Sequence, residues 1–292
     1  MLDPKEIPCS PIKNTLVLLV TCSQDESRRV LAEKVAQNIS TLASEAGLAS
    51  SLVLFDNASK YTDHLKYMPA HSYICCSERN IGYWSAIDWV LRNRDSLGGR
   101  GKKYLYIVES DLWHDSLLPL AECEAFLDLE NSAVGVRTQE FSVRGRWRYD
   151  KGLSHVPFRK RRSLIHLVNQ ATGEKAWFKK TSLNNLWLSN IHAKLPALNR
   201  IDALENVFRQ LAARETFSEV DFFRLMMAQM PRIGILDGGI WHQLSTLDTS
   251  EVTSGSWSSE AELKKLGYQT TRTASIDRTM PIVSVRVVGS QA

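Results

Sequence analysis

The sequence lacks the features that mark several common protein classes. Its five cysteines include no CxxC pair, which argues against a disulfide framework or a thiolate zinc site and suits a reducing compartment. No segment approaches the roughly 18 apolar residues of a membrane-spanning helix, and residues 1–14 lack the basic-then-apolar order of a secretory signal. We therefore expect a soluble, cytoplasmic protein with no transmembrane segment.

Glycine-rich phosphate loops are also missing. The stretch after the first predicted strand reads Thr21-Cys22-Ser23-Gln24-Asp25, and no GxGxxG motif follows any predicted strand. This pattern excludes a dinucleotide-dependent dehydrogenase and disfavours a nucleotidyltransferase, which normally carries a glycine-rich, basic phosphate loop at that position. No internal repeat and no low-complexity segment is present.

The bulk composition is that of an ordinary globular protein. The 292 residues are 43% hydrophobic and 23% charged, with a formal net charge of +4, and we favour one α/β domain. The charge is unevenly distributed, because residues 137–180 contain twelve Lys/Arg and only three Asp/Glu. This asymmetry indicates an anionic partner near that segment, which could be a pyrophosphate, a nucleic acid or an acidic lipid surface.

Hydrophobic periodicity predicts an alternation of strands and helices. The apolar run 15–20 is typical of a buried parallel strand, helical spacing follows from residue 28 to a C-cap at Gly47, and 51–55 forms a second strand. Further strands are expected at 72–76, 104–108, 133–136, 176–178, 233–236 and 282–288, and further helices at 86–91, 201–213 and 221–227. We expect a mostly parallel central sheet with helices on both faces: a domain at 1–246 and a C-terminal extension at 247–292 packed on it.

Three predicted strands of this sheet end in polar or acidic residues, and in open α/β sheets ligands gather beyond the carboxyl ends of the strands. Glu109 and Asp111 flank one small residue directly after the 104–108 strand. Such a pair can direct two carboxylates toward one hard divalent cation, Mn²⁺ or Mg²⁺. Taken alone, acidic residues at a strand end are more often helix caps or solvated turns.

The order of these segments resembles the family-2 glycosyltransferases of GT-A fold, over roughly residues 15–242. It runs strand, helix, a strand ending in DNAS (56–59), a turn with Asn80-Ile81-Gly82, a helix, and a strand ending in ESD (109–111). The resemblance implies that Asp56 contacts the nucleobase of a nucleotide sugar. It also places four other residues beside the donor: Thr21, Asn80, Gly82 and Ser110. Two positions depart from the family pattern, because Asp88 stands where many members have Asn and Glu109 replaces the first Asp of Asp-x-Asp.

The resemblance also implies an acceptor side and a complete metal site. The family's acidic motif at a helix start matches 218–221, with Glu219 at the position of the general base and Asp221 in reserve; the alternative is a helix cap. His242, after the 233–236 strand, would complete the metal site with Glu109 and Asp111, and the alternative there is a packed histidine. Tyr83 and Trp84 could stack on a base or sugar, but aromatic residues at a helix start are usually core anchors, so we leave them outside the predicted site.

The leading hypothesis is a metal-dependent, inverting glycosyltransferase, a hexosyltransferase type using a nucleoside-diphosphate donor such as a UDP-sugar. Its acceptor would be a hydroxyl of a glycan, a lipid-linked molecule or a nucleic acid. The basic, aromatic segment 144–162 leaves two alternatives open. One is glycosylation of modified DNA bases, as in bacteriophage enzymes, and the other is a non-catalytic nucleic-acid-binding protein on the same scaffold.

Overall fold

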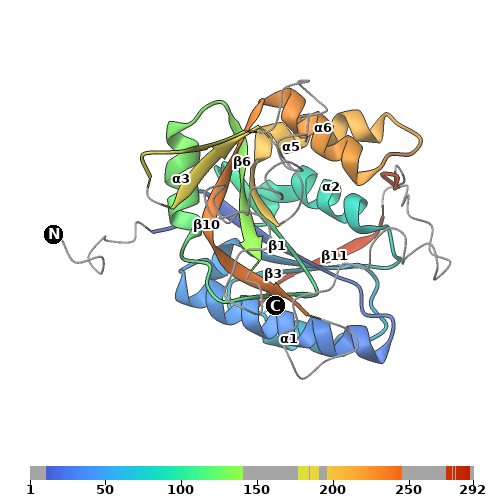
Figure 1. The fold of residues 1–292 in the computed structure, drawn as a ribbon. Helices are drawn as coiled ribbons and strands as arrows, with labels where there is room; N and C mark the ends of the chain where they lie inside the picture. Colours follow the sequence, from blue (N-terminus) through green and yellow to red (C-terminus); the bar gives the residue numbers. More distant parts are fainter. Residues whose placement is uncertain are drawn as a thin grey trace, which may run out of the picture.

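The computed structural model describes residues 11–140, 177–183, 185–190, 196–244, 274–277, 279 and 281–289. One mixed sheet runs through this part of the chain in the order β11-β3-β2-β1-β4-β9-β6-β10-β8-β7, and β5 pairs with β10 (Figure 1). The strands are β1 (Thr15–Thr21), β2 (Leu52–Asp56), β3 (Tyr73–Ser77), β4 (Tyr104–Glu109), β5 (Leu112–His114), β6 (Ala133–Glu140), β7 (Phe178–Lys180), β8 (Leu186–Ser189), β9 (Ala197–Arg200), β10 (Arg232–Gln243) and β11 (Val283–Val287). The helices are α1 (Glu26–Glu45), α2 (Tyr83–Asn93), α3 (Leu120–Leu129), α5 (Ile201–Ala212) and α6 (Glu219–Gln229).

The middle of the sheet is a run of four parallel strands, β3-β2-β1-β4. Strand β10 is also parallel to β6, whereas β9, β8, β5 and β11 join their neighbours antiparallel. The predicted α/β class is therefore confirmed, and the sheet expected to be mostly parallel is parallel at its centre and mixed overall.

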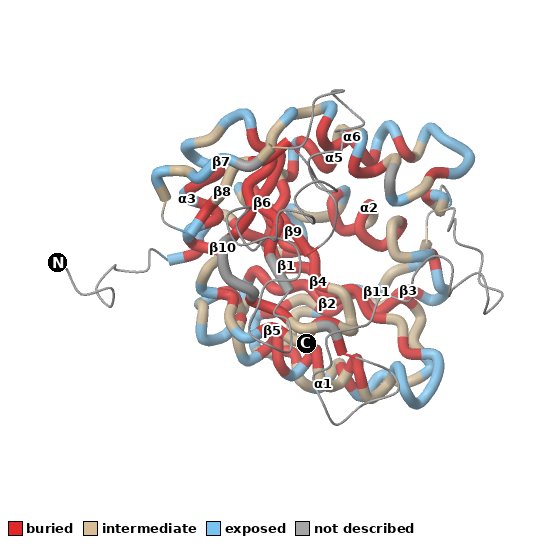
Figure 2. The backbone as a smooth tube through the Cα atoms, in the orientation of Figure 1, coloured by how far each residue is buried: buried red, intermediate tan, exposed pale blue. Residues whose placement is uncertain are grey.

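Helices cover both faces of the sheet, as predicted. Leu16 and Leu18 of β1 point into a core that includes the apolar residues of α2, α5 and α6, whereas Val17 and Leu19 point into a core that includes those of α1 and α3. This alternation is the period of two that a strand imposes on its side chains. The central strands are buried along their length (Figure 2).

Local capping explains where the first helix begins and ends. The Asp25 side chain accepts a 2.8 Å hydrogen bond from the Arg28 backbone N–H at the start of α1. The helix ends at Glu45, and Gly47 then adopts φ +69°, a left-handed conformation that glycine tolerates best. The predicted helix and its glycine C-cap are confirmed.

Several elements were not predicted. Strands β5, β8 and β9 are only three or four residues long, too short for a periodic pattern to identify. Strand β10 was expected to end at residue 236, with His242 after it. It continues to Gln243, because register shifts against β6 around Gly239 let the pairing resume beyond the glycines.

The C-terminal apolar run forms the predicted strand at the sheet edge, where β11 pairs antiparallel with β3. Before it, Ala274 bridges Phe217, and Asp277 forms a 2.7 Å ion pair with Arg79. The described residues 274–277 thus contact both the segment before α6 and Arg79 after β3, and β11 lies at the edge next to β3. The boundary predicted at residue 246 stays a prediction, and the expected connection at 245–259 lies outside the described residues. No helix in the described ranges is long and apolar enough to cross a membrane.

A buried carboxylate ties the start of β1 to α3. Glu124 accepts hydrogen bonds from the backbone N–H groups of Lys13 (3.1 Å) and Asn14 (2.9 Å) and from the Thr15 hydroxyl (2.6 Å). With donors on both of its oxygens, the carboxylate fixes the strand at the end opposite Thr21.

Replacing Glu124 with Gln should destabilise the protein, because the new amide group must face a backbone donor. We expect a loss of about 1–3 kcal/mol in the free energy of unfolding, measured by urea denaturation. Glu122→Gln, a change at an exposed neighbour on α3, is the matched control and should fall within about 0.5 kcal/mol of the wild type. Equal midpoints for both variants would contradict this anchoring role.

Candidate active site

The carboxyl ends of the parallel strands meet at one edge of the sheet. Thr21 at the end of β1 lies opposite Asp56 at the end of β2, and Val20 lies opposite Glu109 at the end of β4. Parallel pairing therefore brings together residues predicted for the donor site and the metal site from three separate segments of the chain.

Asp56 and Thr21 belong to a buried polar cluster. The Asp56 Oδ1 atom lies 3.2 Å from both the Thr21 hydroxyl and His64 Nε2, and its Oδ2 accepts a 3.3 Å hydrogen bond from the Ser59 N–H. The same His64 nitrogen is 3.0 Å from the Thr21 hydroxyl. Both carboxyl oxygens of Asp56 thus have partners inside the protein. The cluster fixes the ends of β1 and β2 relative to each other, and the predicted base contact of Asp56 stays a prediction.

His64 itself was missed. It lies eight residues after Asp56 in a short 3₁₀ helix (Asp63–Tyr67) and is fully buried. A histidine in an irregular segment carries no periodic signal, so its contact with the two strand ends could not be read from the sequence.

A network of asparagine side chains shapes the turn before α2. The Asn57 side chain donates to Asn80 Oδ1 (2.9 Å) and accepts from the Ile81 N–H (2.8 Å), and Asn80 Oδ1 also accepts from the Gly82 N–H (2.9 Å). Gly82 has φ +84° and is the N-cap of α2, which explains glycine at this position. The predicted donor residues Asn80 and Gly82 therefore lie beside the ends of β1 and β2.

The acidic motif forms the last residue of β4 and the turn that follows it. Glu109, Ser110 and Asp111 are all half-buried, and the chain then enters β5. The backbone carbonyl of Asp111 accepts a 2.7 Å hydrogen bond from the Leu244 N–H. Pairing of β5 with β10 therefore brings the end of β10 beside the acidic turn.

His242 lies on β10 opposite Trp113 of β5, close to the acidic turn along the sheet. Its Nε2 is 3.0 Å from Asp115 Oδ2. In the described part of the chain, no three His, Cys, Asp or Glu side chains are close enough together to hold a metal ion. The predicted trio of Glu109, Asp111 and His242 is therefore not a preassembled three-ligand site, and the metal role of His242 stays a prediction.

A buried hydrogen-bond network supports β5 and β10 beneath the acidic turn. The Tyr106 hydroxyl lies 2.9 Å from His114 Nε2 and 3.2 Å from the Thr138 hydroxyl, which accepts a 3.1 Å bond from Trp241 Nε1. Asn38 of α1 pairs with both backbone groups of His114, at 2.8 and 2.9 Å. Burial lowers the pKa of His114 to about 4, so its ring is neutral at pH 7.

The two acids predicted as general base have different surroundings at the start of α6. Asp221 and Ser218 form a capping box, in which Asp221 Oδ2 accepts from the Ser218 N–H (2.8 Å) and hydroxyl (2.7 Å). These hydrogen bonds, with the nearby Arg214 and Arg224, lower the pKa of Asp221. Asp221 is thus occupied as a helix cap. Glu219, the first residue of the helix, is exposed, and its role as the base stays a prediction.

Tyr83 is the first residue of α2, and its ring packs edge-on against Trp84. Its hydroxyl is buried, and the charges of Glu109, Glu219 and Asp111 act on it, in that order of strength. Burial, followed by these negative charges, raises the pKa of Tyr83 well above its usual value.

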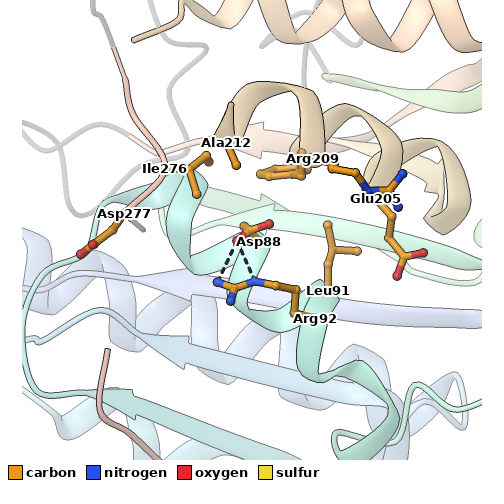
Figure 3. A pocket seen from close by; sticks show the side chains of 9 residues that line it. Asp88, Leu91, Arg92, Glu205, Arg209, Ala212, Ile276 and Asp277 are labelled. Carbon is orange, nitrogen blue, oxygen red and sulfur yellow. Dashed lines mark hydrogen bonds and ion pairs between the residues drawn. The ribbon is translucent and has the colours of Figure 1, made fainter. Parts of the chain in front are cut away.

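Away from this edge, α2, α5 and the 274–277 segment enclose a pocket of about 430 Å³ (Figure 3). Asp88 lies in it, and its Oδ2 accepts a 2.9 Å hydrogen bond from Arg92 Nε and forms a 2.8 Å ion pair with the same guanidinium group. Burial raises the pKa of Asp88, an effect that Arg92 opposes. Asp88, which stands where many members of the resembled family have Asn, therefore lines this pocket. The basic segment 144–162 lies outside the described residues, so its predicted anionic partner stays a prediction.

No family model and no curated protein matches the sequence. Similar solved structures include residues 1–349 of S. aureus TarS, which is 17% identical with a TM-score of 0.45, over 82% of this chain and 63% of that one. The same segment in complex with UDP-GlcNAc is 16% identical with a TM-score of 0.46, over 87% and 64% of the two chains. A mannose-1-phosphate geranyltransferase from Thermus thermophilus is 9% identical with a TM-score of 0.38, over 78% and 76%.

This chain therefore spans less than two thirds of those two TarS structures. The assignment of a site and a substrate rests on the chain's own residues.

The buried, neutral His114 should make stability depend on pH. Its pKa is about 4 in the folded protein and 6.5 when unfolded, so the unfolded chain binds more protons between these values and stability falls as the pH drops. From pH 7 to pH 5 this residue should remove about 2 kcal/mol from the free energy of unfolding. Urea denaturation of the wild type and of His114→Gln at both pH values measures the difference.

The free energy of unfolding lost between pH 7 and pH 5 should be smaller in His114→Gln than in the wild type by about 2 kcal/mol. His71→Asn, a change at an exposed histidine, should leave the wild-type pH dependence intact. A His114→Gln variant that loses as much stability as the wild type would show that His114 is protonated in the folded protein.

Proposed function

We propose that this protein is a glycosyltransferase that moves a sugar from a nucleoside-diphosphate donor to a hydroxyl acceptor, with inversion at the anomeric carbon. One observation carries the proposal. The parallel strands β1, β2 and β4 end at one edge of the sheet, where Thr21 lies opposite Asp56, Val20 lies opposite Glu109, and the half-buried turn with Asp111 follows. An acidic pair for a cation–diphosphate complex and a separate exposed carboxylate for the acceptor are what such a transfer requires.

The polar ends of β1, β2 and β3 would form the donor side of this site. Thr21 and Asp56 are held together through His64, and Asn80 and Gly82 are held by Asn57. A fixed set of polar groups at strand ends is suited to a nucleoside. The N-terminus of α2, which begins directly after Gly82, adds a partial positive charge that favours phosphate groups nearby.

The residues present fit a divalent cation of the Mn²⁺ or Mg²⁺ type. Mg²⁺ is usually held by one or two carboxylates together with substrate phosphates and water. Glu109 and Asp111 supply such a half-buried pair, and a third protein ligand is not needed. When bound, the cation would neutralise charge that develops on the leaving diphosphate.

Glu219 would act on the acceptor. As the acceptor oxygen bonds to the anomeric carbon, the bond from that carbon to the diphosphate oxygen breaks, and the proton of the acceptor hydroxyl passes to Glu219. The capping box holds the first turn of α6 through Ser218 and Asp221, so the backbone that carries Glu219 is fixed before the acceptor arrives.

Thermal stability measured against a panel of nucleotide sugars, with and without Mn²⁺, tests the proposal. UDP-GlcNAc belongs in the panel because it is the ligand in one of the TarS complexes. We expect one donor to raise the midpoint of unfolding in the presence of Mn²⁺, and the same donor to give nucleotide release. If no donor shifts the midpoint while single- or double-stranded DNA does, the transferase proposal fails and a nucleic-acid-binding function replaces it.

Two variants check the assigned roles on the donor that this panel identifies. Asp111→Asn should abolish Mn²⁺-dependent turnover without unfolding the protein, and Glu219→Gln should lower kcat by about 10²–10⁴-fold with donor binding retained. Glu215→Gln, at a nearby exposed position, is the matched control and should remain active. Near-normal rates in Asp111→Asn or Glu219→Gln would contradict the corresponding assignment.

A further inference from the structure

The C-terminal segment 274–277 contacts three separate elements of the proposed site, and the first of them is the start of α6. Ala274 exchanges two backbone hydrogen bonds with Phe217, at 2.7 and 2.8 Å. Phe217 directly precedes Ser218, the N-cap of α6, and stands two residues before Glu219. The segment therefore holds the chain at the point where the helix with the proposed base begins.

The same segment is hydrogen-bonded to the first turn of α2. The Ser85 hydroxyl accepts a 2.8 Å bond from the Asp277 N–H and donates a 3.4 Å bond to the Ser275 carbonyl. Ser85 is buried, and so is Ile276, which belongs to the apolar core that includes residues of α2, α5 and α6. Figure 3 shows Ile276 and Asp277 beside α2. The segment is thus fixed to α2 by both hydrogen bonds and packing.

The third element is the turn formed by residues 79–82, called here the donor turn. Asp277 Oδ2 lies 2.7 Å from the Arg79 guanidinium, which also donates to the Thr279 hydroxyl. Asp277 Oδ1 accepts hydrogen bonds from the Thr279 N–H (2.9 Å) and hydroxyl (2.6 Å). Arg79 directly precedes Asn80, whose side chain is held by Asn57. The donor turn is therefore held by the end of β2 and by the C-terminal segment together.

Aromatic packing between α2 and α6 does not by itself set this geometry. Trp84 packs against Phe217 and Phe222, with ring centroids 5.8 and 4.8 Å apart, but apolar contacts are less directional than hydrogen bonds. The Arg79 side chain is half-exposed, and an ion pair with such a partner contributes little to stability. Its loss should therefore change the alignment of the connected elements more than it changes the stability of the fold.

We propose that residues 274–277 are a positioning brace of the transfer site, with Asp277 as its central residue: they set the position of Glu219 relative to Asn80 and Gly82 of the donor turn. The inference rests on the proposed function. A general base acts only within hydrogen-bond reach of the proton that it removes. A small displacement of the start of α6 relative to the donor would therefore lower kcat without changing how the nucleotide is held.

Asp277→Asn tests the brace, because it replaces the oxygen that faces Arg79 and keeps the size of the side chain. Well below the midpoint of unfolding, we expect kcat to fall about tenfold, while the Kd for the nucleoside diphosphate with Mn²⁺ stays within about twofold of the wild type. Arg79→Gln should give the same result, and Arg79→Lys, which keeps the charge, should recover most of kcat. The double variant of Asp277→Asn and Arg79→Gln should lose no more than either single variant.

Asp128→Asn is the matched control. It removes a 2.9 Å ion pair with Lys103, which directly precedes β4 at the end opposite the acidic turn, so kcat should stay at the wild-type value. Hydrogen exchange gives a second readout that needs no substrate. The amides of residues 217–222 should exchange faster in Asp277→Asn than in the wild type or in Asp128→Asn.

Three kinetic results would each overturn the proposal: a wild-type kcat in Asp277→Asn and Arg79→Gln, an equal loss of kcat in Asp128→Asn, or a rise in Kd as large as the fall in kcat. Unchanged hydrogen exchange at 217–222 would overturn it as well. A wild-type protein that binds no nucleotide and releases none would instead defeat the proposed function, and the exchange measurement would still show whether the segment holds the start of α6.

Discussion

The parallel hydrogen bonding of β1 to β2 and β4 is the constraint on which the rest of the site depends. Pairing in this register puts Thr21 opposite Asp56 and Val20 opposite Glu109, so the residues that follow each strand emerge at the same edge of the sheet. Both faces of these strands are buried, each in one of the two apolar cores. A one-residue slip would exchange the side chains that fill the two cores and disrupt the close packing of both, so the register, and with it the position of the strand ends, is fixed by core packing.

Polar groups in the interior then refine the positions of the strand ends. Glu124 holds the beginning of β1, His64 joins the ends of β1 and β2, and the network around His114 joins β4, β5 and β10. Each network connects separate segments of the chain, and the one around His114 includes Tyr106 and Trp241 of an apolar core. Together they give a rigid frame from which Glu109 and Asp111 project at a turn, and rigid support of this kind is what electrostatic catalysis needs.

Much of this fold follows from sequence periodicity, because the long elements carry clear signals. The apolar run of β1, the helical spacing of α1 and the glycine after it, and the short strands ending at Asp56 and Glu109 all lie where the pattern predicted them. Strands β5 and β9 were missed because three or four residues contain no full period. The length of β10 was misjudged because glycines normally end a strand, whereas here register shifts let the pairing continue.

The site was predictable to the extent that it follows strand ends and helix starts. Glu109, Asp111 and Glu219 could be proposed from their order in the chain, and their roles stay predictions. Tyr83 itself was set aside because an aromatic residue at a helix start usually serves the core. Only three-dimensional packing shows that its ring contacts Trp84 and that its hydroxyl is buried. His64 gave no signal for the same reason, since its partners are set by tertiary contacts.

A crystal structure of the protein with Mn²⁺ and a nucleoside diphosphate, with the metal located by anomalous scattering, tests the central claim most directly. The account predicts one Mn²⁺ peak with carboxylate oxygens of Glu109 and Asp111 about 2 Å away, bridging to the diphosphate, and the base near the ends of β1 and β2. Nucleotide bound elsewhere, for example in the pocket around Asp88, or a metal held without either carboxylate, would contradict it.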